Sequence, residues 1–294
     1  MGIREALAFR RGSIHFWRNV GRSVKESVER GRWGLGKTVF QASSRINAFL
    51  GLTVRSEDRR SYAMGQAVLK IHSVAGRRFV PYGYFGEFDG TLPVPIQDPS
   101  FLELLRQDFG LSRRRESGLS VVIPYPDPDI DVARIVRSVI HHYFFPILAG
   151  DLTVEVQGNG VSETLDTRTL PIFVERSQLE DRHDLGRLLK LAQWGLSRRE
   201  EDYVVLKLPT PGSAPKLDES LFEPDALNLL RQKFDNEEPI ALLIPVTIQQ
   251  KGAQAFQHTR LHMYLRRDAS FERAEDHFIR QGITIADVHS LRTR

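Results

Sequence analysis

The amino-acid sequence predicts an α/β (α+β) protein built from two domains, and three observations lead to this prediction. The chain has 294 residues, which is enough for two ordinary domains that each bury a core. Some segments carry apolar residues at helical intervals, whereas others are short runs that alternate or cluster as in strands. Turn-forming residues separate these segments, and the sequence contains no internal repeat. We expect a first domain over residues 1–165 and a second α/β domain over residues 166–294.

The composition excludes several classes of protein. Hydrophobic residues make up 41% of the chain and charged residues 27%, and no apolar run approaches the roughly 20 residues that span a membrane. The absence of cysteine excludes disulfides, thiolate metal sites and a cysteine nucleophile. Residues 1–17 contain arginines where a secretion signal has an apolar stretch. We therefore expect a cytoplasmic protein with no membrane partner.

Positive charge is concentrated at the start of the chain, although the formal net charge is only +4. The first forty residues hold nine lysines and arginines against three glutamates. Two interpretations of this bias remain open. It is either a solvated charged face or the contact surface of a phosphate-bearing partner such as nucleic acid.

The first predicted helix follows a glycine-rich loop. Residues Gly31–Gly36 form that loop, apolar residues recur at helical intervals from Lys37 to Leu50, and Gly51 ends the helix. Short strand-like runs follow and are expected to pair in one sheet, with a short helix packed by Phe101–Leu105 among them. The strand-like runs are Leu52–Val54, Ala67–His72 and Leu119–Ile123, and a turn at Pro124–Pro128 closes the last one.

The remaining segments alternate between helices and strands. Asp131–Phe145 has helical spacing with Pro146 as its expected end, and Asp151–Val156 alternates like a strand. The later segments are a helix at Leu185–Leu196, a strand at Tyr203–Leu208, a linker at Pro209–Pro215, a helix at Pro224–Phe234, and strands at Ile240–Gln249 and His258–Arg266 joined by a turn at Gln250–Ala255.

One segment carries a phosphate-binding pattern. The run Gly31-Arg32-Trp33-Gly34-Leu35-Gly36-Lys37-Thr38 matches G-x-x-x-x-G-K-[ST]. In a phosphate-loop protein this pattern follows a buried parallel strand, yet residues 23–30 are polar. Two further interpretations stay open, namely an anion held by the unpaired amides at a helix start and a glycine-rich turn before a packed helix.

The same region resembles a known superfamily. The segments Phe16-Trp17-Arg18, Gly21-Arg22-Ser23, Lys25 and Gly31–Lys37 resemble the lid and second glycine box of GHKL ATPases, whose ATP-binding domain is the Bergerat fold. Gly118-Leu119-Ser120-Val121 is similar to a late Gly-Thr strand motif of that domain, with Leu119 in place of the threonine. The resemblance implies a partial Bergerat-type sandwich of mixed sheet and helices, followed by a transducer-like domain.

The resemblance also implies ATP and Mg²⁺ as cofactors and assigns roles to residues. Ser23 and Lys25 belong to the lid, and Ser120 lies beside the nucleotide. The phosphate-binding residues that it implies are Gly31, Gly34, Leu35, Gly36, Lys37 and Thr38.

No catalytic residue is assigned by this resemblance. The superfamily places its acidic residue, its magnesium-binding asparagine and its Asp-x-Gly segment upstream, and in residues 1–13 the only carboxylate is Glu5. We therefore expect the later half of an ATPase domain that binds nucleotide weakly by itself and couples nucleotide binding to conformational change. A homodimer or a missing upstream segment is the expected partner.

The alternative function is a non-catalytic interaction module, in which a degenerate ATPase half binds a partner protein or nucleic acid. Arg113-Arg114-Arg115 predicts a surface loop first and a phosphate or nucleic-acid contact second. No metal site is expected, because His258 and His262, although four residues apart, lie in a segment that alternates as a strand does.

Overall fold

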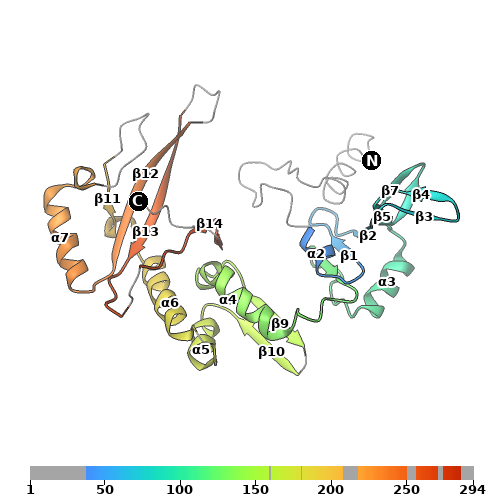
Figure 1. The fold of residues 1–294 in the computed structure, drawn as a ribbon, viewed down its shortest axis with the longest axis horizontal. Coiled ribbons are helices and arrows are strands. Elements are labelled where there is room, and N and C mark those ends of the chain that lie inside the picture. Colours follow the sequence, from blue (N-terminus) through green and yellow to red (C-terminus); the bar gives the residue numbers. More distant parts are fainter. Residues whose placement is uncertain are drawn as a thin grey trace. The chain divides into compact units, whose positions relative to one another are not determined.

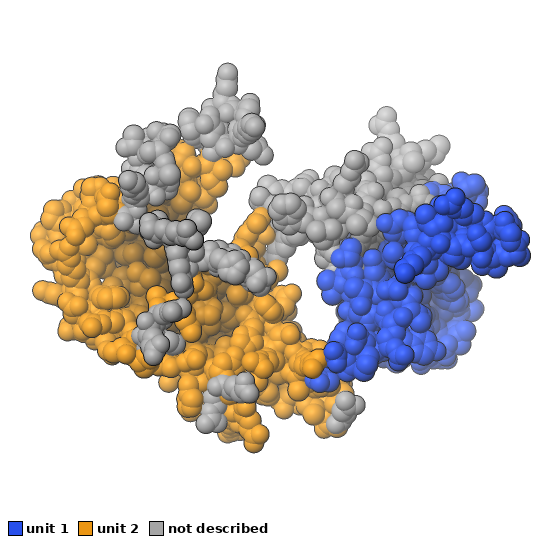
Figure 2. Space-filling model, viewed as in Figure 1, with its two compact units in different colours: residues 1–131 blue, residues 132–294 orange. Residues whose placement is uncertain are grey.

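The computed structural model describes residues 38–158, 160–179, 181–207, 218–249, 256–270 and 274–285. The chain divides into two compact units, residues 1–131 and 132–294 (Figure 2). The described residues form both helices and strands, which confirms the predicted α/β (α+β) class. The predicted domain boundary at residue 165 falls inside the second unit, because the helix and hairpin just before it pack there. No helix in the described ranges is long and apolar enough to cross a bilayer.

Unit 1 is organised around a four-stranded sheet in the order β5-β2-β1-β8, in which every neighbouring pair is antiparallel. Helices α2 and α3 and two short hairpins accompany the sheet (Figure 1). The elements of unit 1 are α2 (Thr38–Ala42), β1 (Ala48–Val54), β2 (Ser61–Val68), β3 (His72–Val74), β4 (Arg77–Phe79), β5 (Tyr82–Phe85), β6 (Glu87–Asp89), β7 (Leu92–Val94), α3 (Pro99–Asp108) and β8 (Gly118–Val122).

The predicted helix over residues 37–50 is wrong beyond Ala42. The chain turns at residues 43–47, where Asn47 has a φ of +50° and its amide donates to the Ser44 carbonyl. It then forms the central strand β1, which runs through Gly51 and pairs on both sides. The apolar residues at helical intervals also match a strand that is buried on both faces, and the ladder bonds of the sheet decide between the two.

The other strand predictions of unit 1 are largely confirmed. The segments Leu52–Val54 and Leu119–Ile123 belong to β1 and β8, which pair as expected. The predicted strand Ala67–His72 is shifted, because β2 starts at Ser61 and ends at Val68. Helix α3 begins after Asp98, whose carboxylate accepts a hydrogen bond from the Phe101 amide at 2.7 Å, and it buries Leu102 and Leu105 against the sheet.

The described part of unit 2 contains four α-helices and three groups of paired strands. Hairpin β9–β10 and helices α4, α5 and α6 share one core, and a three-stranded sheet pairs β11 parallel and β13 antiparallel to β12. The elements of unit 2 are α4 (Val132–Leu148), β9 (Val154–Gly158), β10 (Val161–Leu165), α5 (Thr169–Arg176), α6 (Arg182–Leu196), η1 (Glu200–Asp202), β11 (Val204–Val205), η2 (Glu219–Leu221), α7 (Pro224–Asp235), β12 (Ile240–Gln249), β13 (Phe256–Leu265), β14 (Ile279–Arg280) and β15 (Ile283–Thr284).

Most helices and strands predicted for this half are confirmed, and their ends differ by a few residues. The exception is Pro146, which lies inside α4 instead of ending it. A proline in the last turn removes only one intrahelical donor, and the neighbouring Ile147 is fully buried, so packing offsets the lost bond. The predicted linker Pro209–Pro215 and the predicted turn Gln250–Ala255 lie outside the described residues.

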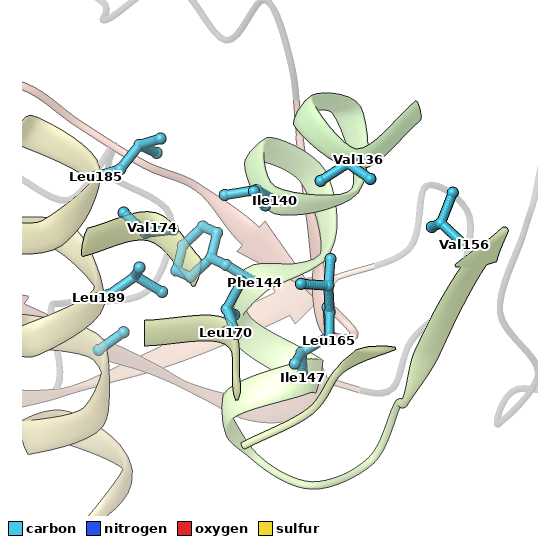
Figure 3. Packing of buried hydrophobic residues seen from close by; sticks show 11 residues of the cluster. Val136, Ile140, Phe144, Ile147, Val156, Leu165, Leu170, Val174, Leu185 and Leu189 are labelled. Atoms are coloured by element: carbon cyan, nitrogen blue, oxygen red, sulfur yellow. The ribbon is translucent and has the colours of Figure 1, made fainter. Parts of the chain in front are cut away.

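The core of unit 2 forms where α4 meets hairpin β9–β10 and helices α5 and α6. Figure 3 shows Ile140, Phe144 and Ile147 of α4 pointing toward Leu165, Leu170 and Val174 from the neighbouring elements. These side chains are almost completely removed from water. Burial of each such side chain contributes roughly 1.5–3 kcal/mol to folding.

We expect Ile140→Ala to destabilise the protein by about 2–5 kcal/mol, because it leaves a cavity in this core. The matched control is Ile135→Ala on the same helix, where the side chain is 38% exposed, and it should cost much less. The free energy of unfolding in urea measures both effects. Equal losses for the two variants would contradict the placement of Ile140 at the centre of the core.

Candidate functional site

The phosphate-binding segment predicted from the sequence lies almost entirely outside the described residues. This applies to Ser23, Lys25, Gly31, Gly34, Leu35, Gly36 and Lys37. Thr38 is described and is the first residue of α2. Helix α2 packs on the sheet of unit 1 through Phe40, whose ring lies 5.4 Å from that of Phe49 on β1. The last residue of the glycine-rich motif therefore belongs to a helix that packs on the sheet.

The two faces of the unit 1 sheet carry different side chains. Directly paired residues share a face, and successive residues of a strand alternate between faces. One face, here called the α2 face, holds the cluster of Phe49, Met64, Tyr84 and Val121 with Phe40 of α2. The other, here called the α3 face, holds the cluster of Leu52, Ala63, Leu102 and Leu105.

Ser120 is on the α3 face, since it pairs with Leu52 of β1. Its hydroxyl accepts a hydrogen bond from Arg113 Nε at 3.2 Å. The structure therefore does not bring Ser120 together with Thr38 and α2. The preceding residue, Leu119, pairs with Thr53 and belongs to the α2 face, where its side chain is 43% exposed.

The arginine loop after α3 has a structural role. Arg113 donates to the carbonyl oxygens of Glu116 and Ser117, and Arg114 forms an ion pair with Glu103 at 2.6 Å. The hydrogen bonds from Arg114 lower the pKa of the Glu103 carboxyl below its usual range. These contacts favour the surface-loop interpretation, because the guanidinium groups of Arg113 and Arg114 are already engaged within unit 1.

Gln66 is an unusual polar residue on the α2 face. It pairs with Phe49 and Tyr84, and it is only 3% exposed. Its side-chain oxygen Oε1 accepts no hydrogen bond from any residue that the structure describes. A buried acceptor without a donor costs about 1–3 kcal/mol.

Replacing Gln66 with methionine, which has a similar volume, should therefore raise the free energy of unfolding by about 1 kcal/mol. The matched control is Gln107→Met on the exposed side of α3, which should change stability little. Urea unfolding of the purified chain measures both. A loss of stability in Gln66→Met would mean that the amide has a partner.

Unit 2 contains two adjoining cavities beside α6 and β13, with volumes of about 370 Å³ and 590 Å³. Arg187 on the smaller cavity donates to Asp184 at 2.6 Å and to Asp268 at 3.1 Å. Hydrogen bonds from Ser270, followed by the charge of Arg187, lower the pKa of Asp268. This cavity therefore presents paired charges beside an apolar wall. Six residues line both cavities: Leu188, Leu191, Tyr264, Leu265, Glu275 and His277.

Tyr264 forms part of the wall of both cavities and packs closely on α6. Its hydroxyl lies 2.8 Å from the hydroxyl of Tyr203, and a Cβ added at Gly195 would lie only 2.7 Å from its ring. Burial first, and then the hydrogen bond with Tyr203, raise the pKa of the Tyr264 phenol. Sequence reasoning missed this contact, although a lone glycine inside an apolar helical pattern is a signal of close approach.

Raising the pH should test this environment. The folded protein keeps Tyr264 protonated above its ordinary pKa of 10.0, whereas the unfolded chain ionises there. The stability that this difference contributes is fully present below that pH and is lost as the pH rises above it. We expect Tyr264→Phe to reduce the loss of stability at alkaline pH, measured as the urea midpoint of unfolding against pH. The control is Tyr125→Phe, at an exposed tyrosine, which should leave that loss unchanged.

The described part of the chain contains no group of three or more histidine, aspartate or glutamate side chains that could hold a metal ion. His258 and His262 both lie on β13, as the alternation predicted. His258 Nδ1 is 3.2 Å from Thr247 Oγ1, and His262 packs edge-on against Tyr203 at 5.1 Å. Both imidazoles thus take part in contacts within unit 2.

Comparison with known proteins adds no assignment: no protein-family model matches the chain, and no match was found among curated proteins or solved structures.

Proposed function

We propose that the glycine-rich segment and helix α2 form the phosphate-binding part of a GHKL-type ATP site, in which nucleotide binding is coupled to conformational change. The observation that carries the proposal is the position of α2. The first described residue of this helix is Thr38, the last residue of the motif, and the helix packs on an antiparallel sheet. Amides at the start of a helix and a neighbouring lysine suit phosphate oxygens.

The direction of the strands favours this proposal over a phosphate-loop NTPase. A phosphate loop joins a helix to a mainly parallel sheet, because each crossover helix returns the chain in the same direction. The sheet under α2 is antiparallel at all three of its strand pairs. Its order also brings β8 next to β1, although more than sixty residues separate these strands in the chain.

The position of Leu119 is a second supporting observation. The resemblance aligns Leu119 with a threonine beside the nucleotide, and Leu119 lies on the α2 face. Ser120 lies on the opposite face and bonds Arg113, so the proposed site does not include it.

The fit to the implied cofactors is partial. Lys37, Thr38 and the backbone amides around them would hold the phosphates of ATP. The described residues offer no group of carboxylates or histidines for Mg²⁺, so the proposal assigns no protein ligand to that ion. Unit 2 would relay the nucleotide state.

A thermal melt of the whole chain with and without ATP tests the proposal. A ligand that binds only the folded state raises apparent stability by RT ln(1 + [L]/Kd), about 1.4 kcal/mol at a tenfold excess over Kd. We expect a small rise at high ATP concentration, its loss in Lys37→Ala, and its retention in the control Lys190→Ala. No rise, or a rise that Lys37→Ala leaves intact, would overturn the proposed site.

A further inference from the structure

The hairpin β3–β4 is an arm that extends from the sheet of unit 1. Strands β2 and β5 pair first, the Leu69 amide donates to the Pro81 carbonyl at 2.7 Å, and the chain continues into β3 and β4 (Figure 1). The turn at its tip consists of Ala75 and Gly76, with φ of +48° and +75°, as tight two-residue hairpin turns require. Here "the arm" means residues 69–82.

The arm is unusual in its exposure. Every residue from Leu69 to Val80 is exposed, including four aliphatic side chains that a solvated hairpin does not need. Exposed apolar side chains concentrated on one short hairpin are a feature of interaction sites. The exposed aliphatic residues are Leu69, Ile71, Val74 and Val80.

All the charged side chains of the arm are basic. The sequence has no aspartate or glutamate between Asp58 and Glu87, whereas the arm carries Lys70, Arg77 and Arg78. No ion pair joins these three cations to any residue of the described ranges. This differs from Arg113 and Arg114 in the same unit, which are held by internal acceptors. A polyanion therefore complements the arm.

Aromatic rings are exposed among these charges. His72 pairs with Phe79 across the hairpin, and their rings stack at 5.5 Å with an interplanar angle of 16°. The register places Arg77 on the same face, because it pairs with Val74, two residues from His72. Flat rings beside guanidinium groups are the elements on which nucleic-acid bases stack.

We propose that the β3–β4 arm binds single-stranded nucleic acid, with Lys70, Arg77 and Arg78 contacting phosphates and the His72–Phe79 pair stacking on a base. Arg77 and Arg78 are adjacent in β4 and point to opposite faces of the ribbon. A flexible single strand can pass over the tip and reach both faces. This proposal does not depend on the nucleotide site, since it uses a different part of unit 1.

Two other occupants fit the same observations less well. Insertion of the tip into an anionic membrane would bring the guanidinium groups of Arg77 and Arg78, one on each face, toward the apolar layer at a cost in free energy. In a nucleic-acid duplex the bases are already stacked, so the exposed ring pair would have no base face to meet.

The test is fluorescence anisotropy of the whole chain with a labelled oligothymidine of about 16 nucleotides over a series of salt concentrations. The arm-charge variant combines Lys70→Ala, Arg77→Ala and Arg78→Ala. Each phosphate contact to a single strand contributes about 0.7 to the slope of log K against log salt, so the slope should fall by about 2. Phe79→Ala should weaken binding by at least about fivefold and leave the slope unchanged.

The controls separate the arm from general charge. Arg168→Ala, Lys190→Ala and Arg199→Ala together remove three cations from exposed positions of unit 2, and should leave binding nearly unchanged. All residues of the arm-charge variant are exposed, so its thermal melt should match that of the unmodified chain.

Four outcomes would overturn the proposal. The first is the absence of oligothymidine binding, and the second is an equal loss in the unit 2 control. The third is binding of a duplex as tight as that of the single strand with no effect of Phe79→Ala. The fourth is loss of binding to phosphatidylserine vesicles, or of self-association in light scattering, in the arm-charge variant while oligothymidine binding is retained.

Discussion

The pairing of β1 on both of its edges is the constraint on which unit 1 depends. β1 forms antiparallel ladders with β2 and with β8, and these ladders satisfy its backbone amides and carbonyls in the extended conformation. Its side chains then alternate between two buried clusters, with Phe49 under α2 and Leu52 under α3. The two faces of the sheet, and therefore the surroundings of any ligand on either face, follow from this one strand.

Helix α4 has the corresponding role in unit 2. Its buried stripe of Val136, Ile140, Phe144 and Ile147 contacts the hairpin before α5 and the helices α5 and α6. The stripe continues past Pro146 because the core extends there, and Asp151 and Leu152 return their amides to the Pro146 carbonyl. In both units, burial and the satisfaction of backbone groups therefore override a local signal that would end or redirect the chain.

The two proposals rest on separate parts of unit 1 and on different chemistry. The nucleotide proposal concerns the α2 face, where the helix that contains Thr38 of the motif packs on the sheet. The nucleic-acid proposal concerns the arm, where stacked rings are exposed and no residue of the described ranges forms an ion pair with the three cations. A GHKL-type ATPase that acts on nucleic acid would use both surfaces. Each proposal can nevertheless be correct without the other.

The sequence by itself determined the class of the fold, the positions of the longer helices and strands of unit 2, and the glycine-rich motif, because these follow from local periodicity and turn residues. The segments that became α6, α7, β12 and β13 were predicted within a few residues for this reason. Only the tertiary structure decided that residues 48–54 form a central strand, that Ser120 and Leu119 belong to opposite faces, and that α4 belongs to the second unit. Register and packing join residues far apart in the chain, and a pattern of neighbouring residues carries no information about such partners.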